Sequence, residues 1–141
     1  MKLSAKTNYA FRALLELVLH WPQDIPLQIS SIASRQKIPL KFLTQILLEL
    51  KQLGLVESVR GQKGGYLLVK APQEISLRQV IQHFEKSYFS LRSRKQKKEA
   101  NILASIMDEV EEQARGALDR ITFDDIAARE RNLKTVPMFT I

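Results

Sequence analysis

The strongest constraint on this chain comes from the pattern of residues 28–71. A short helix is predicted at Ser30–Gln36, where a serine hydroxyl can cap the first turn. Pro39 suits the first turn of a second helix because its φ angle is already helical. Apolar residues then recur at steps of three and four, and Gly54 can adopt the positive φ that ends the helix. The predicted buried face of this second helix consists of Leu40, Leu43, Ile46, Leu47, Leu50 and Leu53.

Two strands joined by a glycine-rich turn follow. Leu55–Arg60 and Tyr66–Val69 are predicted strands, and residues 61–65 between them include three glycines, which indicates a β-hairpin. The preceding connection, Ile25–Ile29, is predicted to be extended and to join the same sheet. Helix, turn, helix and hairpin together are the outline of a winged helix, in which the second helix is the recognition helix and the hairpin is the wing.

The flanking sequence predicts further helices. The first lies within Met1–His20 with Ser4 as its N-cap, and another lies within Ile75–Phe84 with Ser76 as its N-cap. A long amphipathic helix follows at Glu99–Ile121. The fold class is therefore mainly α with a small β wing. The predicted divisions are a winged helix at 1–86, a basic loop at 87–98, a long helix with a short following helix at 99–130, and a tail at 131–141.

The long helix has little of its own domain to bury against. A second copy of the chain is the economical partner, which predicts a two-fold symmetric homodimer. The alternative is that the helix folds back on its own domain, and the short helix that starts at Ile121–Ile126 could pack across the dimer. The predicted dimerisation residues are Ile102, Leu103, Ile106, Met107, Val110, Ala114 and Leu118.

Charge is distributed unevenly along the chain. The formal charge of +7 divides into +6 for residues 1–70, +5 for residues 71–98 and −4 for residues 99–141. The positive field therefore belongs to the part with the helix-turn-helix, as binding to phosphates requires.

The residue inventory argues against an enzyme or a metal protein. The absence of cysteine excludes disulfides, thiolate catalysis and cysteine-ligated metals. His20 and His83 are the only histidines, and no catalytic triad, P-loop or dinucleotide fingerprint is recognisable. No apolar run suits a membrane span or a signal peptide, so a cytoplasmic protein is expected.

The outward residues of a recognition helix read base edges in the major groove. Gln45 has the donor and acceptor that grip an adenine edge, whereas Lys41 and Thr44 can reach a base or a phosphate. An arginine at the wing, Arg60, suits a narrow minor groove. The full set of predicted DNA-binding residues is Lys6, Tyr9, Ser30, Lys41, Thr44, Gln45, Arg60, Lys63 and Gly64. Two alternatives remain: a winged helix that contacts proteins, or a non-specific RNA or membrane-surface binder that uses the basic run Arg92–Lys98.

Four segments resemble the Rrf-two (Rrf2) family of bacterial winged-helix regulators: Met1–Ala10, Ile32-Ala33, Phe42–Leu47 and Val59–Leu68. The resemblance covers Met1 to about Phe84 and is looser beyond. It implies a homodimer, joined through the long helix, that binds double-stranded DNA at a partly palindromic operator and controls transcription. Of the two modes of control, we expect repression. It also implies base-reading positions at Lys41, Thr44 and Gln45, and a minor-groove position at Arg60.

One departure from the family pattern concerns its cofactor. Many members of the family that this sequence resembles hold a [2Fe–2S] cluster on three cysteines. Those cysteines lie in a loop that corresponds to residues 88–101. This sequence has no cysteine there or elsewhere, so no cluster, cofactor or metal is expected. Family members without a cluster respond to a protein or a small molecule, and an effector of either kind is expected here.

Overall fold

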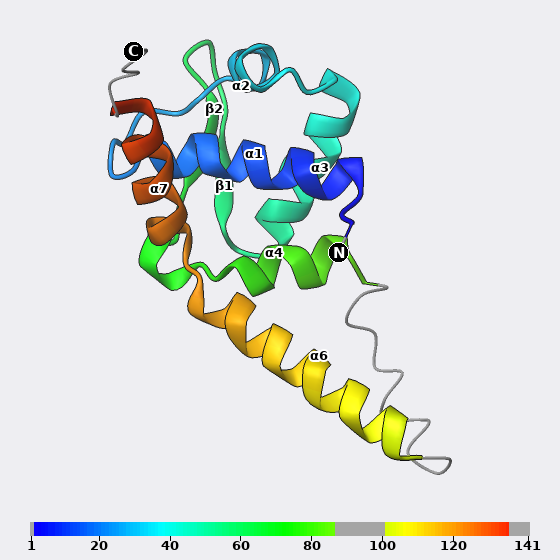
Figure 1. Ribbon diagram of the computed structural model, residues 1–141. Helices are drawn as coiled ribbons and strands as arrows, with labels where there is room; N and C mark the ends of the chain where they lie inside the picture. The colour runs from blue at the N-terminus through cyan, green and yellow to red at the C-terminus, as the bar shows by residue number, and fades with distance from the viewer. Residues whose placement is uncertain (1, 87–100, 136–141) are drawn as a thin grey trace, which may run out of the picture.

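The computed structural model describes residues 2–86 and 101–135, and these form a helical body with one long projecting helix (Figure 1). A two-stranded antiparallel sheet is the β structure of the described part, which agrees with the predicted fold class. The elements in chain order are α1 (Ala5–Leu19), α2 (Ile29–Gln36), α3 (Leu40–Gln52), β1 (Val56–Val59), β2 (Gly65–Leu68), the 3₁₀ turn η1 (Pro72–Glu74), α4 (Leu77–Phe84), α6 (Ile102–Arg120) and α7 (Phe123–Thr135).

The core forms where α1 crosses α3. Ser4 caps α1 by accepting a hydrogen bond from the backbone N–H of Thr7, as predicted. Leu14 on α1 and Leu43 on α3 are completely buried, and each such side chain stabilises the fold by about 1.5–3 kcal/mol. The prediction was wrong for Leu40 and Leu53, which are 56% and 37% exposed because they lie at the two ends of α3. The other α3 residues in this core are Ile46, Leu47 and Leu50.

The N-terminus of α2 has no side-chain cap. The helix starts at Ile29 with Gln28 as its N-cap, and no side chain caps it, so the predicted serine cap was wrong. Lys37 ends α2 with a left-handed φ of 52°. The guanidinium of Arg12 donates to the carbonyl of Gln36 at 2.8 Å, which satisfies a carbonyl that the helix end leaves free.

The wing depends on glycines at close backbone contacts. β1 and β2 pair in antiparallel register, with Val59 opposite Gly65. A Cβ on Gly65 would lie 2.2 Å from the carbonyl oxygen of Leu27, because Leu27 forms a single bridge with Tyr66. The extended connection therefore meets the sheet as predicted, but at one bridge rather than along a strand.

The C-terminal helices differ in how they meet the body. α6 projects away from it and has no buried residue, and its C-terminal end meets α4 through an ion pair of 2.8 Å between Arg78 and Asp119 (Figure 1). α7 returns to α1 of the same chain, where Phe123 is fully buried and its ring centroid lies 5.6 Å from that of Phe11. The short helix predicted to pack across a dimer therefore packs within its own chain, and it continues to Thr135, beyond the predicted start of a tail.

None of the helices in the described residues has the length and apolar character that a membrane span needs. The predicted basic loop at 87–98 lies outside the described residues.

Candidate nucleic-acid interface

The outer side of α3 carries a polar strip of Lys41, Thr44 and Gln45, which the apolar side chain of Leu48 extends. Lys41, Thr44, Gln45 and Leu48 are all exposed, whereas Leu43 and the rest of the inner face are buried. Positions spaced by three, four and seven residues share one face of a helix, so these four side chains form one strip. The strip lies on the helix that the sequence predicted to read bases.

An open groove of about 410 Å³ separates this strip from the wing. It brings together Ser30 on α2, Thr44 on α3 and Gly64 in the wing turn, three of the predicted contact residues. The Thr44 hydroxyl donates to the carbonyl of Leu40 at 2.9 Å, so its oxygen remains able to accept a hydrogen bond. Gln28, which sequence reasoning did not single out, lines the same groove and donates to the carbonyl of Gln62 at 3.1 Å.

Three cationic side chains of the predicted interface are not paired with a carboxylate of the described residues. Lys41, Arg60 and Lys63 are exposed, and none of them forms an ion pair with another described residue. Their charges therefore remain available for phosphate oxygens.

Lys6 differs from these three, because its ammonium lies 2.8 Å from the Glu49 carboxylate of α3. The Nε2 atom of His83 on α4 lies 3.1 Å from the same carboxylate. Burial alone would raise the pKa of Glu49, but the contacts with Lys6 and His83 outweigh it and hold that pKa below its ordinary value. The three residues thus link α1, α3 and α4, and Lys6 belongs to this link rather than to a free phosphate-binding surface.

Tyr9 and Gly64 are also engaged within the protein. The half-buried Tyr9 ring lies 6.1 Å from the ring of Phe42, and the Arg12 guanidinium lies 5.1 Å from the Tyr9 centroid. Gly64 is buried, and its backbone N–H donates to the carbonyl of Gly61 at 3.0 Å. A Cβ on Gly64 would lie 2.2 Å from the carbonyl oxygen of Val59, so this glycine shapes the wing turn.

Phe42 is the residue that sequence reasoning missed most clearly. It is 50% exposed on α3, although it is large and apolar. Its position falls outside the three- and four-residue spacing of the buried stripe, and this signal was available in the sequence.

The predicted dimerisation residues form an uncovered apolar stripe on α6. Ile102, Leu103, Ile106, Met107 and Val110 are all exposed, Ile102 to 79%, whereas Ala114 and Leu118 near the body are partly covered. Contiguous exposed apolar residues of this kind mark interaction surfaces.

Comparisons with known proteins agree on one family. The Rrf2 family, described as iron-dependent transcriptional regulators, matches residues 3–129. An HTH-type transcriptional regulator of Synechocystis, slr0846, is 42% identical over 87 residues, which cover 62% of this chain and 58% of that protein. The regulator IscR of Pectobacterium carotovorum is also 42% identical over 87 residues, covering 62% of this chain and 52% of its own length. The chain thus spans about half the length of these curated relatives.

Solved structures match over more of the chain. IscR of T. potens has a TM-score of 0.79 at 28% identity and covers 99% of this chain and 95% of its own. The oxidised form of CymR from Staphylococcus aureus has a TM-score of 0.73 at 29% identity and covers 90% of this chain and 96% of its own.

The donor set of this chain does not fit the iron in the family's description. The sequence has no cysteine to hold an iron–sulfur cluster, and the described residues contain no group of three or more histidine, aspartate or glutamate side chains that could hold a metal ion. The match nevertheless extends over most of the sequence and includes the recognition helix and the wing. The chain belongs to the Rrf2 family.

Proposed function

We propose that this chain is a non-enzymatic, homodimeric repressor that binds a partly palindromic DNA operator in the cytoplasm. The observation that carries the proposal is the exposed polar strip of α3 beside a wing whose cations are unpaired within the described residues. A helix inserted in the major groove and a wing on the adjacent backbone would use both surfaces at once. The curated relatives are named as HTH-type transcriptional regulators, which supports the same function.

Each contact has a chemical role. The Gln45 amide would read an adenine edge with a donor and an acceptor, and Lys41 would reach a guanine or a phosphate. Arg60 would enter the minor groove, and Lys63 would neutralise a phosphate. Thr44 and Ser30 line the groove between these elements and would hydrogen-bond the backbone or a base.

The homodimer would form through α6. Its 19 residues extend about 28 Å at 1.5 Å per residue, and the exposed apolar stripe follows the N-terminal half of that length, from Ile102 to Val110. Two stripes packed together would place two recognition helices on one duplex, where half-sites one turn apart lie about 34–36 Å from each other.

A titration with DNA tests the contact residues. Fragments of the source genome that the protein retains would first be sequenced, and one retained fragment and a scrambled version would then be titrated by fluorescence anisotropy at two salt concentrations. Gln45→Ala should lower the preference for the retained fragment by about 1–3 kcal/mol. Arg60→Ala should weaken binding to both fragments and reduce the salt slope by about 1.

The matched control is Arg120→Ala, which removes the same charge from an exposed side chain in the last turn of α6, on neither α3 nor the wing. It should leave the preference for the retained fragment unchanged. Equal affinities of the wild type, Gln45→Ala and Arg60→Ala would contradict the assigned contacts and favour a protein-interaction module or a non-specific binder.

Sedimentation tests the homodimer separately. Glutamates placed at Ile106 and Val110 would bury charges in the proposed interface, so this double variant should sediment as a monomer. Glu112→Gln, on the charged face of the same helix, should remain a dimer. Dimers that persist in the double variant would rule out the α6 interface.

A further inference from the structure

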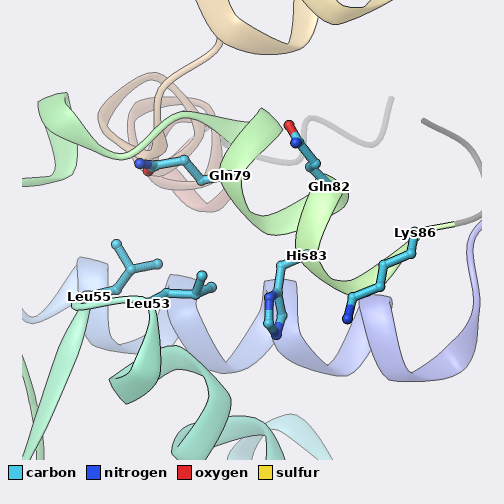
Figure 2. Close-up of a pocket in the computed structure, with 6 residues that line it drawn as sticks. All are labelled: Leu53, Leu55, Gln79, Gln82, His83 and Lys86. Atoms are coloured by element: carbon cyan, nitrogen blue, oxygen red, sulfur yellow. The ribbon is translucent and has the colours of Figure 1, made fainter. Parts of the chain in front are cut away.

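A cavity of about 400 Å³ opens between the end of α3 and the outer side of α4. Its volume lies within the range of about 300–1,000 Å³ that is usual for small-molecule sites. Figure 2 shows His83 on α4 and Lys86, two residues beyond the end of α4, on the same side as Leu53 and Leu55. The remaining lining residues are Gln79 and Gln82.

The two ends of the cavity differ in chemistry. Leu53 and Leu55 supply an apolar wall, whereas Lys86 supplies a cation that forms no ion pair with any described residue. Beside the polar end, His83 contacts the Glu49 carboxylate at 3.1 Å. Lys6 compensates its charge from 2.8 Å, so the polar end favours an anion.

From this arrangement we infer that the cavity binds a small organic acid, with its carboxylate at Lys86 and its aliphatic chain on Leu53 and Leu55. The acid would serve as the effector of the regulator, and that role rests on the DNA-binding function proposed above. An aliphatic acid suits a site in which one wall is apolar and the opposite end is basic. Regulation by such an acid needs no iron–sulfur cluster, and this sequence has no cysteine to hold one.

The position of the cavity explains how the acid would affect DNA binding. Leu53 is the C-cap residue of α3, and its backbone N–H donates to the carbonyl of Glu49 at 3.0 Å. His83 contacts Glu49 from α4, and α4 is tied to α6 through Arg78 and Asp119. An acid in this cavity therefore contacts the end of the recognition helix and the element that meets α6. A ligand can shift the equilibrium between two conformations of the protein only by as much as its affinities for those conformations differ.

Binding is tested first without DNA. Hexanoate would be titrated into the full chain labelled at leucine methyl groups, with uncharged hexanamide as the matched probe. Hexanoate should shift the methyl signals of Leu53 and Leu55 and bind at least tenfold more tightly than hexanamide, since a charged hydrogen-bonded contact contributes about 1.5–3 kcal/mol. The absence of shifts at these methyls, or equal binding of the two probes, would overturn the site.

Two variants localise the acid. Lys86→Gln should weaken hexanoate binding about tenfold, whereas Lys134→Gln, a lysine on α7 paired with Glu130, should bind as the wild type does. Gln79→Trp should fill the cavity and abolish binding, and its circular dichroism would show whether α4 is retained. Unchanged binding by Lys86→Gln would overturn the site whether or not Gln79→Trp folds.

The effector role is tested last, with the retained DNA fragment and saturating hexanoate. A change in DNA affinity that Lys86→Gln reduces supports the inference, and an unchanged affinity overturns it. Methyl shifts in a protein that binds no DNA would contradict the proposed function and leave the cavity as a ligand site. Specific DNA binding without methyl shifts would contradict only the inference drawn from the cavity.

Discussion

Replacing Phe123 by alanine tests whether α7 is part of the winged-helix body. The Phe123 side chain is fully buried, its ring lies against Phe11, and its backbone N–H donates to the carbonyl of Ile75 at 2.9 Å. A buried aromatic side chain removes about 150–250 Å² from water, and at about 25 cal/mol per Å² this corresponds to roughly 4–6 kcal/mol. Alanine retains part of this burial, so Phe123→Ala should lower the free energy of unfolding by about 4 kcal/mol.

Urea unfolding at one fixed protomer concentration measures this change, because the proposed dimer would make stability depend on concentration. With a slope of about 2 kcal/mol per molar, the midpoint should fall by about 2 M. The melting temperature should fall by about 10 °C or more. Leu133→Ala is the matched control, since Leu133 lies on the same helix and is 75% exposed. If both variants lost less than about 1 kcal/mol, α7 would not be part of the core.

Three more predictions concern the wing and two carboxylates. Gly64→Ala should lower both thermal stability and DNA affinity, because its Cβ would collide with the Val59 carbonyl oxygen. Hydrogen bonds from Ser4 and Thr7 hold the pKa of Glu85 below its ordinary value, so the ionised group stabilises the fold above pH 5 and that stability is lost as the pH falls through the lowered pKa. Glu85→Gln should therefore lower the free energy of unfolding by about 1 kcal/mol at pH 7. In urea titrations at acidic pH, the free energy of unfolding of this variant should depend less on pH than that of the wild type. Lys6→Met should weaken DNA binding, and Glu49→Gln in the same chain should restore most of it, as a double-mutant cycle by anisotropy would show.

Each of these predictions has a control. Gly116→Ala adds a Cβ that meets only the flexible end of Arg120 at 3.3 Å, so it should be neutral or stabilising. Glu112→Gln removes an exposed charge and should leave the pH dependence of the free energy of unfolding at acidic pH nearly unchanged. For the cycle, a Lys6→Met variant that reduces the salt slope by about 1 and is not rescued by Glu49→Gln would instead identify Lys6 as a phosphate contact.

Local sequence signals were sufficient for the elements that surround the interface. Ser4 and Ser76 cap helices where predicted, because a serine hydroxyl just before a helical apolar repeat can accept a hydrogen bond from a backbone N–H of the first turn. Gly54 adopts a φ of 76° after α3, as the end of that helix required. The outer strip of α3 also followed from its spacing, since Leu43 and the inner face must be buried together.

Contacts between distant elements could not be read in the same way. Phe123 joins the core only because α6 returns the chain to α1, and no local pattern encodes that return. Leu40 fits the apolar repeat of α3 but is exposed, because the repeat does not say where the facing helix ends. Lys6 had the charge of a phosphate ligand, yet its partner Glu49 is 43 positions away and is brought close only by the fold.

Glu49 explains why a lysine far from the groove can matter for DNA binding. A carboxylate on a recognition helix repels the phosphates on both sides of the major groove unless another charge compensates it. Lys6 and His83 supply that compensation and at the same time attach α3 to α1 and α4. The same contacts thus orient the polar strip and remove the one negative charge of α3 from the field that DNA would meet. An arrangement in which α3 is held by charges as well as by apolar contacts can also respond to a further anion at Lys86, in the cavity that His83 lines.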